Sequence, residues 1–228
     1  MHPAARCRPV LAAESPGYVQ LNTRPLGGHA RLLALVGDGK RVLDVGCSSG
    51  YLARPLAERG CTVTGIERDP DAAAVARTVC EQVLVGDVEV MALPFEADSF
   101  DVILCGDLIE HLREPEQFLA RVRPYLGSGG MLVLSTPNVA NWSIRLSLLV
   151  GRWRYTNRGI LDRTHLHLFT RKTLVETLRQ AGYRIVELDF TVPVPGRGTP
   201  IVEQAAHAVG RLRPTLFAYQ FVVAAEPT

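Results

Sequence analysis

The sequence predicts a doubly wound α/β fold, in which a mostly parallel sheet of seven strands lies between two layers of helices. Short apolar runs rich in β-branched residues alternate along the chain with helical stretches. Several of these runs are continuously apolar, as expected for strands that helices cover on both faces. No internal repeat or long linker interrupts the alternation, so we expect one domain over residues 1–228.

Apolar and β-branched content predicts the strands, and these are residues 41–45, 62–67, 82–85, 100–105, 131–136, 184–191 and 217–225. Helical segments separate most neighbours, which predicts parallel pairing. The last two segments flank a Pro-rich stretch, 192–200, and a short helical segment. We therefore expect these last two strands to form an antiparallel edge of the sheet, with the last strand antiparallel to its neighbours.

Apolar spacing and capping residues predict the helices, and these are residues 50–59, 71–80, 115–126, 170–181 and 201–212. Asp69 is a typical N-cap for the second of them, and Thr170 for the fourth. Residues 1–38 should form an N-terminal cap with an entry helix. Residues 138–169 should form a lid over the substrate, because ligands bind beyond the carboxyl ends of the strands in open α/β sheets.

Composition favours a soluble, cytoplasmic protein with no nucleic-acid partner. The net charge is +2 and the pI is about 8.3, which is mild for a nucleic-acid-binding chain. The sequence shows no apolar run of 18 residues and no signal-peptide core. Five cysteines occur without a CxxC pair, which favours a reducing compartment over a disulfide framework.

The turn after the first strand, in the segment VLDVGCSSGYL, favours a ligand that carries a positive charge. Backbone amides between Gly46 and Gly50 and the following helix start would face that ligand. A dinucleotide-binding turn requires G-x-G-x-x-G, but Ser48 and Tyr51 replace its second and third glycines. Asp44 would repel a pyrophosphate and attract a cation.

Acidic residues also follow the next two strands, where they predict a nucleoside site. Glu67 ends the second strand, a position that commonly accepts two ribose hydroxyls. Asp87 follows the third strand and can accept the exocyclic amine of a base, while Val88 packs against the ring. Gly106 follows the fourth strand.

Four motifs, VLDVGCSSGYL, GIERD, GDVEVMALPFEADSFDVILCGDLIEHL and GSGGMLVLSTPN, together span about residues 40–138. In their order and spacing the chain resembles the class I methyltransferases that use S-adenosylmethionine. Among these it is most similar to the ubiquinone-biosynthesis O-methyltransferase branch. The resemblance implies a Rossmann-like fold, S-adenosylmethionine as cofactor and S-adenosylhomocysteine as product. Ser48 departs from the family's usual glycine, and we expect this small residue to be tolerated.

The resemblance also implies roles for the residues at the strand ends. Asp44 would lie near the cofactor's ammonium, Glu67 would bind the ribose, and Asp87 would bind the adenine amine. The complete set of predicted cofactor-binding residues is Asp44, Gly46, Cys47, Ser48, Gly50, Tyr51, Glu67, Arg68, Asp87, Val88, Cys105 and Gly106.

Titratable residues after the fourth strand, Asp107, Glu110 and His111, would share one face of a helix, and His165 and His167 occur later. Three hypotheses stay open. His111 or His165 is a general base for an acceptor hydroxyl. Alternatively, Asp107, Glu110, His111 and His165 bind a divalent metal. Metal-dependent relatives, including plant-type small-RNA 2′-O-methyltransferases, have a similar E-x-x-E-H segment, although Asp107 replaces the first glutamate here. In the third hypothesis these residues are structural.

Aromatic residues of the predicted lid are candidates for the acceptor pocket. The predicted substrate residues are Trp142, Trp153, Tyr155, His167 and Phe169. Two alternatives stay open for the segment 142–155: packing of a short helix on the sheet, and a weak membrane-surface contact that would suit a lipid-like acceptor.

The favoured function is methyl transfer from S-adenosylmethionine to a small-molecule acceptor, and the preference for a hydroxyl rests on the resemblance alone. One alternative is a metal-dependent RNA 2′-O-methyltransferase, which the mild charge disfavours. Another is a non-catalytic cofactor-binding or scaffold protein, which the acids at three strand ends disfavour. The sequence leaves the oligomeric state open.

Overall fold

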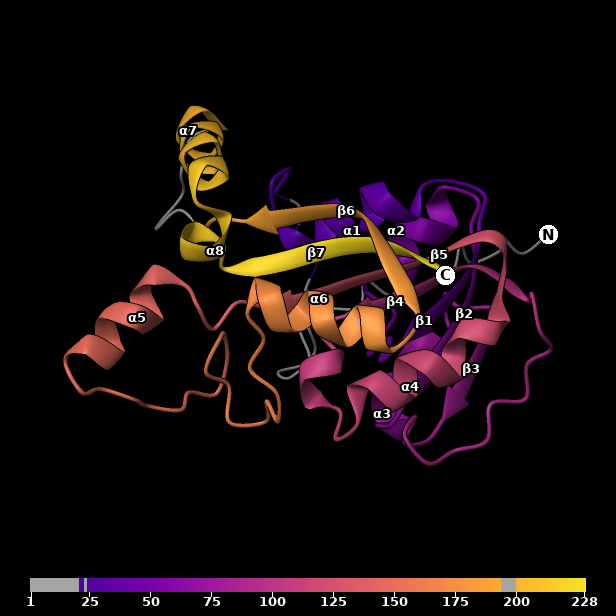
Figure 1. Cartoon of the computed structure of the whole chain (residues 1–228). Coiled ribbons are helices and arrows are strands. Elements are labelled where there is room, and N and C mark those ends of the chain that lie inside the picture. Colours follow the sequence, from indigo (N-terminus) through magenta and orange to yellow (C-terminus); the bar gives the residue numbers. More distant parts are fainter. Residues whose placement is uncertain (1–20, 23, 194–199) are drawn as a thin grey trace, which may run out of the picture.

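The computed structural model describes residues 21–22, 24–193 and 200–228. Its seven strands form one sheet in the order β3-β2-β1-β4-β5-β7-β6 (Figure 1). The strands are β1 (Arg41–Val45), β2 (Thr62–Glu67), β3 (Gln82–Val85), β4 (Phe100–Gly106), β5 (Leu126–Pro137), β6 (Tyr183–Thr191) and β7 (Gln220–Pro227). Neighbours among β1 to β5 pair in parallel, and β7 runs antiparallel to both β5 and β6. The predicted fold class is confirmed.

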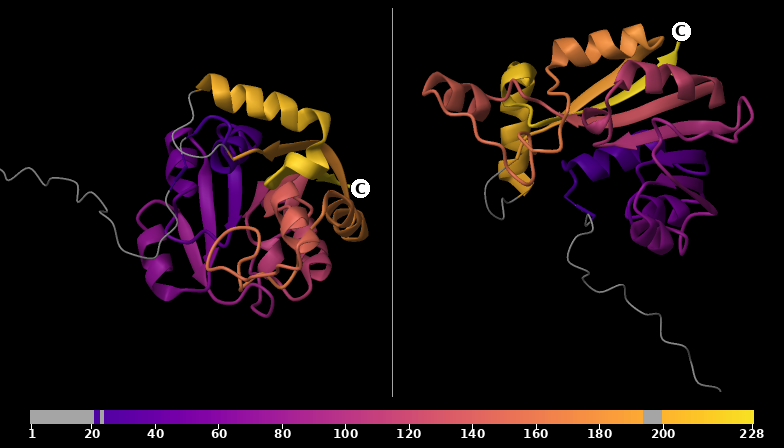
Figure 2. Two further views of the ribbon diagram at one scale, coloured as in Figure 1. Left: turned by 90° about the vertical axis from the view of Figure 1, so that its left-hand side faces the viewer. Right: turned by 90° about the horizontal axis from the view of Figure 1, so that it is seen from below.

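Helices cover both faces of this sheet (Figures 1 and 2). One face carries α1 (Gly28–Val36), α2 (Ala53–Glu58) and α3 (Pro70–Ala76), whose buried residues share one apolar cluster. The other face carries α4 (Pro115–Val122) and α6 (Arg171–Gln180), which belong to the second cluster. Strand order reverses between β1 and β4, which places the ligand crevice of a doubly wound sheet at their carboxyl ends.

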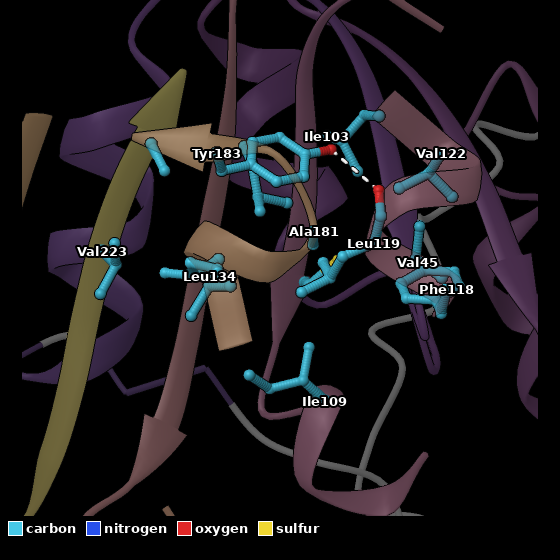
Figure 3. Packing of buried hydrophobic residues seen from close by; sticks show 14 of the residues in the cluster. Val45, Ile103, Ile109, Phe118, Leu119, Val122, Leu134, Ala181, Tyr183 and Val223 are labelled. Atoms are coloured by element: carbon cyan, nitrogen blue, oxygen red, sulfur yellow. Dashed lines mark hydrogen bonds between the residues drawn. The ribbon is translucent and has the colours of Figure 1, made fainter. Parts of the chain in front are cut away.

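The apolar cluster under α4 and α6 supports the carboxyl end of β4 (Figure 3). Phe118 and Leu119 of α4 are 3% and 0% exposed, and they pack in the same cluster as Ile103 of β4. The Tyr183 hydroxyl donates a hydrogen bond to the Leu119 carbonyl at 3.1 Å. Ile109, three residues after the end of β4, is fully buried here as well. The segment that carries the predicted catalytic residues is thus anchored in the core.

Several predicted boundaries were wrong, and local geometry explains two of them. Helix α2 begins at Ala53 and not at residue 50, because Gly50 has φ +75°, a left-handed conformation that no right-handed helix contains. Phe217 does not begin a strand, because Pro214 opens a short helix, α8 (Pro214–Phe217), and β7 begins at Gln220. Strand β5 is longer than predicted, since Leu126 already pairs with Phe100 of β4.

Two helices lie beyond the carboxyl end of the sheet. Helix α5 (Trp142–Leu149) projects from the body at the left of Figure 1 and has no buried residue. Helix α7 (Pro200–Leu212) follows β6. Within the described residues, no helix is both long and apolar enough to cross a membrane. Residues 1–20 of the predicted N-terminal cap lie outside the described residues, whereas α1 lies where an entry helix was expected.

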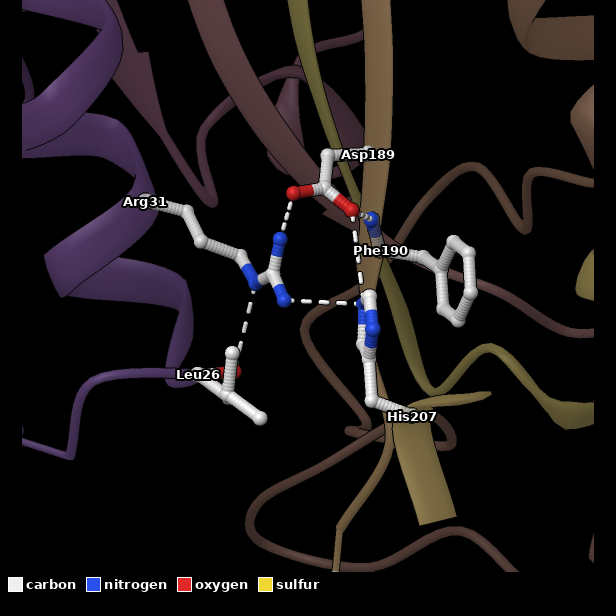
Figure 4. A network of polar contacts seen from close by, with 5 residues as sticks. All are labelled: Leu26, Arg31, Asp189, Phe190 and His207. Carbon is white, nitrogen blue, oxygen red and sulfur yellow. Dashed lines mark hydrogen bonds and ion pairs between the residues drawn. The ribbon is translucent and has the colours of Figure 1, made fainter. Parts of the chain in front are cut away.

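A polar network joins α1, β6 and α7 (Figure 4). The Arg31 guanidinium forms an ion pair with Asp189 and donates to Nε2 of His207 at 2.8 Å. Arg31 also donates to the Leu26 carbonyl at 3.3 Å. Phe190 stacks on the His207 ring with centroids 4.7 Å apart. One guanidinium therefore holds three separate segments of the chain together.

Candidate active site

The turn after β1 has three residues with left-handed backbone. Gly46, Ser48 and Gly50 have φ values of +75°, +49° and +75°. The backbone N–H of Gly46 donates to the Ile66 carbonyl at 2.8 Å, which ties the turn to β2. A Cβ at Gly50 would lie 2.6 Å from the side chain of Val79, so this glycine permits close packing against the segment after α3. Ser48 adopts the conformation for which the family's glycine is suited.

Glu67 links the turn after β1 to the turn after β2. Its Oε2 accepts from the backbone N–H of Ser48 at 2.8 Å, and its Oε1 accepts from that of Asp69 at 2.8 Å. A carboxylate has about four acceptor sites, so each oxygen retains capacity for a ligand hydroxyl. Arg68 lies between these residues and is exposed.

Asp44 is buried, and no cationic side chain among the described residues pairs with it. It is 2% exposed, and in the part of the chain that the structure describes its Oδ2 has no hydrogen-bond partner. Burial, and then the negative charge of Glu67, raise the pKa of Asp44 to about 7. A cationic ligand at this position would remove the unfavourable energy of the ionised carboxylate. The site therefore fits the ammonium of S-adenosylmethionine.

Tyr51 and Gly106 lie on the same side of the sheet as Asp44. A Cβ at Gly106 would lie 3.3 Å from Leu52, 3.4 Å from Leu32 and 3.8 Å from the Tyr51 hydroxyl. The Tyr51 ring contacts that of His29 with centroids 5.0 Å apart. Burial, and then the charge of Asp44, raise the pKa of the Tyr51 hydroxyl.

The two cysteines of the predicted cofactor set have side chains in the hydrophobic core. Cys47 is 1% exposed and belongs to the cluster under α1, α2 and α3. Cys105 is fully buried in the cluster under α4 and α6. Burial raises the pKa of the Cys105 thiol, and a hydrogen bond with Cys80 followed by burial raises that of Cys47. Both thiols therefore act as core residues in this structure.

The exit of β3 is held by local hydrogen bonds. The Asp87 carboxylate accepts from the backbone N–H of Glu89 at 2.9 Å, and Val88 is 7% exposed. Arg121 of α4 donates to the carbonyls of Val88 and Glu89. The predicted adenine-binding residues thus lie on a turn that α4 holds in place.

Asp107, Glu110 and His111 do not share a helix face, because Asp107 has φ +49° and lies outside the 3₁₀ turn η1 (Ile109–His111). The expectation of one helical face was wrong. Asp107 instead accepts hydrogen bonds from the Ser135 hydroxyl, at 2.8 Å, and from the Gln220 amide. These contacts tie the exit of β4 to β5 and β7.

The loop before α6 is attached to η1, which brings two distant histidines together. The carbonyl of Glu110 accepts from the backbone N–H groups of Leu166 and His167 at 2.8 and 3.0 Å. The rings of His111 and His165 meet edge to face with centroids 4.8 Å apart. Part of the predicted lid therefore completes the site that begins at the end of β4.

Glu110 is the second buried acid of the site. It is 1% exposed, and its Oε2 accepts from the Thr136 hydroxyl at 3.0 Å. No described residue forms a hydrogen bond with its Oε1. Burial, and then the charge of Asp107, raise the pKa of Glu110 well above its ordinary value. Burial lowers the pKa of His111.

A cavity of about 270 Å³ opens beside these residues. It is lined by Asn22, Gly28, His29, Asp107, Glu110, Pro137, Gly159, His165, Tyr219 and Gln220. Tyr219 and Gln220 were not identified as site residues from the sequence. They reach the cavity because Gln220 pairs with Pro137 across β5 and β7, and no local motif signals that pairing.

The predicted aromatic pocket is not assembled in this structure. Trp142 and Tyr155 are 51% and 56% exposed on the projecting segment, where Trp153 contacts Tyr155 with centroids 6.1 Å apart. Phe169 is 4% exposed in the core, and the His167 ring stacks on it at 6.0 Å. None of these five predicted substrate residues lines the cavity.

The sheet order and the acids at the ends of β1, β2 and β3 define the class: a Rossmann-like fold of class I methyltransferase type. A family model described as a methyltransferase domain matches residues 20–188. The chain belongs to this family of S-adenosylmethionine-dependent methyltransferases.

Relatives agree with this assignment. The chain is 32% identical over 158 residues to the ubiquinone biosynthesis O-methyltransferase of Acinetobacter baylyi, covering 66% of each chain. It is 30% identical to the enzyme of the same name from Cereibacter sphaeroides, covering 64% of this chain and 60% of that one. The matched region thus spans slightly less than two thirds of these relatives. The structure of a Thermotoga maritima S-adenosylmethionine-dependent methyltransferase superimposes with a TM-score of 0.63, 17% identity and 88% coverage of each chain.

Proposed function

We propose that the protein transfers the methyl group of S-adenosylmethionine to a hydroxyl of a small-molecule acceptor bound in the cavity beside Glu110. One observation carries the proposal. In the part of the chain that the structure describes, only Asp44 Oδ2 and Glu110 Oε1 are buried side-chain oxygens or nitrogens without a hydrogen-bond partner. Asp44 lies near the end of β1, and Glu110 follows the adjacent strand β4. Buried polar groups without partners are costly, so each favours a ligand group that complements it.

The cofactor side of the site is supported by three acids. Asp44 would bind the ammonium, Glu67 would accept the ribose hydroxyls, and Asp87 would accept the adenine amine. The turn after β1 would bring its backbone close to the cofactor. The buried position of Asp44 would exclude water from the ion pair between its carboxylate and the ammonium. The cofactor supplies an activated methyl group when it is bound, and the protein mainly positions the reactants.

The acceptor side favours an uncharged or cationic molecule of modest size. Asp107 lines the cavity, and its carboxylate disfavours a phosphorylated acceptor or a nucleic acid backbone. The cavity volume of about 270 Å³ lies just below the range of about 300–1,000 Å³ that is usual for ligand pockets, which favours a small acceptor. The relatives named as O-methyltransferases support oxygen as the methylated atom.

Transfer forms a bond between the acceptor oxygen and the methyl carbon, and it breaks the bond between that carbon and sulfur. The hydroxyl proton must leave as the new bond forms. We propose that His165, which lines the cavity, or His111, whose ring contacts it, accepts this proton. Their Nδ1 atoms face the backbone carbonyls of Thr164 (His111) and Ile160 (His165). A carbonyl only accepts, so Nδ1 carries the proton and Nε2 of the neutral ring has a free lone pair.

The test is a screen of metabolite extracts with cofactor labelled on its methyl group, read by mass spectrometry. The proposal expects the label on an oxygen of a small, non-phosphorylated molecule, with transfer by Asp44→Asn reduced at least tenfold at subsaturating cofactor. Label on nitrogen or on RNA would contradict the acceptor assignment. Cofactor binding without transfer to any acceptor would indicate a non-catalytic protein.

A further inference from the structure

We propose that His29 recognises the acceptor, because its Nε2–H group donates a hydrogen bond to an oxygen that the acceptor carries in addition to the methylated hydroxyl. His29 is the second residue of α1, and it lines the cavity of about 270 Å³. It is not among the site residues predicted from the sequence. The inference rests on the proposed function, which places the acceptor in this cavity.

A backbone contact fixes the position of the proton on the His29 ring. The backbone N–H of Asn22 donates to Nδ1 of His29 at 2.8 Å. A backbone N–H only donates, so Nδ1 contributes its lone pair and the proton of the neutral ring lies on Nε2. Burial lowers the pKa of His29, and the charge of Asp107 only partly opposes this effect. The ring is therefore neutral at neutral pH, with Nε2–H as its donor.

His29 thereby differs from His165, the other histidine that lines the cavity. Nδ1 of His165 lies 3.0 Å from the Ile160 carbonyl and must donate, so Nε2 of that ring has the lone pair. One ring at the cavity can thus accept a proton through Nε2, whereas the other donates through Nε2. A hydroxyl that loses its proton suits His165, and an oxygen that keeps its lone pairs suits His29.

The His29 ring lies at the boundary between the cofactor side and the acceptor side of the site. It contacts the ring of Tyr51, next to the turn after β1, with centroids 5.0 Å apart. A Cβ at Gly28 would collide with the side chain of Gln220, so glycine lets the start of α1 lie directly against β7. Among the described residues, none accepts a hydrogen bond from Nε2 of His29. This donor therefore remains for a ligand in the cavity.

The charge beside His29 indicates the kind of oxygen that it binds. The negative charge of Asp107 acts on His29 and disfavours a carboxylate or phosphate at this position. A carbonyl, an ether or a second hydroxyl has no charge and accepts from Nε2–H. The acceptor class is therefore an uncharged molecule with two oxygen functions, of which one is methylated and the other is bound by His29.

The experiment compares two uncharged cyclic alcohols of nearly equal size, tetrahydrofurfuryl alcohol and cyclopentylmethanol. Both have a hydroxyl, but only the first has a ring oxygen where the second has a methylene group. Their dissociation constants are measured by NMR titration of the full chain saturated with S-adenosylhomocysteine. One neutral hydrogen bond corresponds to about 3- to 10-fold in affinity. The preference of wild type for the ring oxygen should therefore exceed that of His29→Phe by this factor.

The variants separate the hydrogen bond from the packing of the ring. His29→Phe keeps an aromatic ring against Tyr51 and removes the donor. His29→Gln has an amide N–H in place of Nε2–H and should restore most of the preference. Ala34→Gln, at an exposed position of the same helix, is the matched control and should have the wild-type preference. The ¹⁵N spectrum of histidine-labelled wild type tests the assigned ring proton without any substitution, should a variant fail to fold.

The same ratio of dissociation constants in wild type and His29→Phe would overturn the proposal, and so would a proton on Nδ1 or a failure of wild type to bind either alcohol. Weaker binding of S-adenosylhomocysteine by His29→Phe, with an unchanged ratio, would overturn it by assigning His29 to the cofactor. If the ratios are as expected but the metabolite screen finds no methylated acceptor, the binding role of His29 stands and the proposed function fails.

Discussion

Replacement of Asp44 by asparagine removes a buried carboxylate whose ionisation is unfavourable in the cofactor-free protein. Its pKa is raised from 3.8 to about 7 in the folded chain, first by burial and then by Glu67. One pKa unit corresponds to about 1.4 kcal/mol of folding free energy. Ionised Asp44 therefore lowers the free energy of unfolding by about 4 kcal/mol once the pH exceeds its folded-state pKa.

The sign of the pH dependence follows from proton binding. Between about pH 4 and pH 7 the folded protein keeps a proton on Asp44 that the unfolded chain has lost, so the free energy of unfolding falls as the pH rises. Asparagine does not titrate. The stability of Asp44→Asn relative to wild type should therefore increase by about 4 kcal/mol between about pH 4 and pH 8.

The assay is urea unfolding of both proteins without cofactor at a series of pH values. Subtraction of one curve from the other removes the contribution of all groups that the two proteins share. Asp38→Asn, at an exposed position, is the control and should show a constant difference from wild type. A constant difference for Asp44→Asn as well would refute the inference that Asp44 is buried without a partner.

Three further outcomes are expected. Ser48→Val should lower the free energy of unfolding by about 1–2 kcal/mol and weaken cofactor binding, because a β-branched residue is strained at φ +49°. Ser48→Gly should keep the wild-type stability and the wild-type affinity for cofactor. If thermal unfolding and calorimetry do not distinguish the two variants, the left-handed conformation assigned to Ser48 is wrong. Asp189→Asn should lower the free energy of unfolding by about 1–3 kcal/mol, because it removes the carboxylate that pairs with Arg31. The control Glu226→Gln, in an exposed ion pair, should lower it by less than about 1 kcal/mol. Equal losses in urea unfolding would argue against a stabilising network around Arg31. Trp142→Ala should change stability by less than about 0.5 kcal/mol, because the side chain is 51% exposed, and a larger loss would show that α5 packs against the body.

The central strands could be predicted because their signals are local. Strands β1, β2 and β3 have the predicted bounds, since each is an apolar run that ends at a charged or glycine-rich turn. The start of β7 could not be predicted, because the apolar residues that follow Pro214 suit a short helix as well as a strand. The pairing of Pro137 with Gln220, which decides the register, is a tertiary contact.

The candidate site likewise contains residues with a local sequence signal and residues whose position depends on tertiary contacts. Asp44 and Glu67 could be proposed from the sequence because an acid near the end of a buried strand is a local feature, and the structure places both near the ends of the adjacent strands β1 and β2. Phe169 resembled a pocket residue, but its place in the core depends on contacts with other elements. The orientation of His111 and His165 depends on two backbone carbonyls, which no side-chain pattern in the sequence can indicate.

The central claim is that the acids at the ends of β1 and β2 bind S-adenosylmethionine, and a calorimetric titration with that cofactor tests it most directly. The account predicts one cofactor per chain, with affinity about tenfold weaker at pH 6 than at pH 8, because only about one tenth of Asp44 is ionised at the lower pH. Asp44→Asn should bind at least tenfold more weakly than wild type at pH 8. Wild-type affinity in this variant, or no binding by the wild-type chain, would contradict the account.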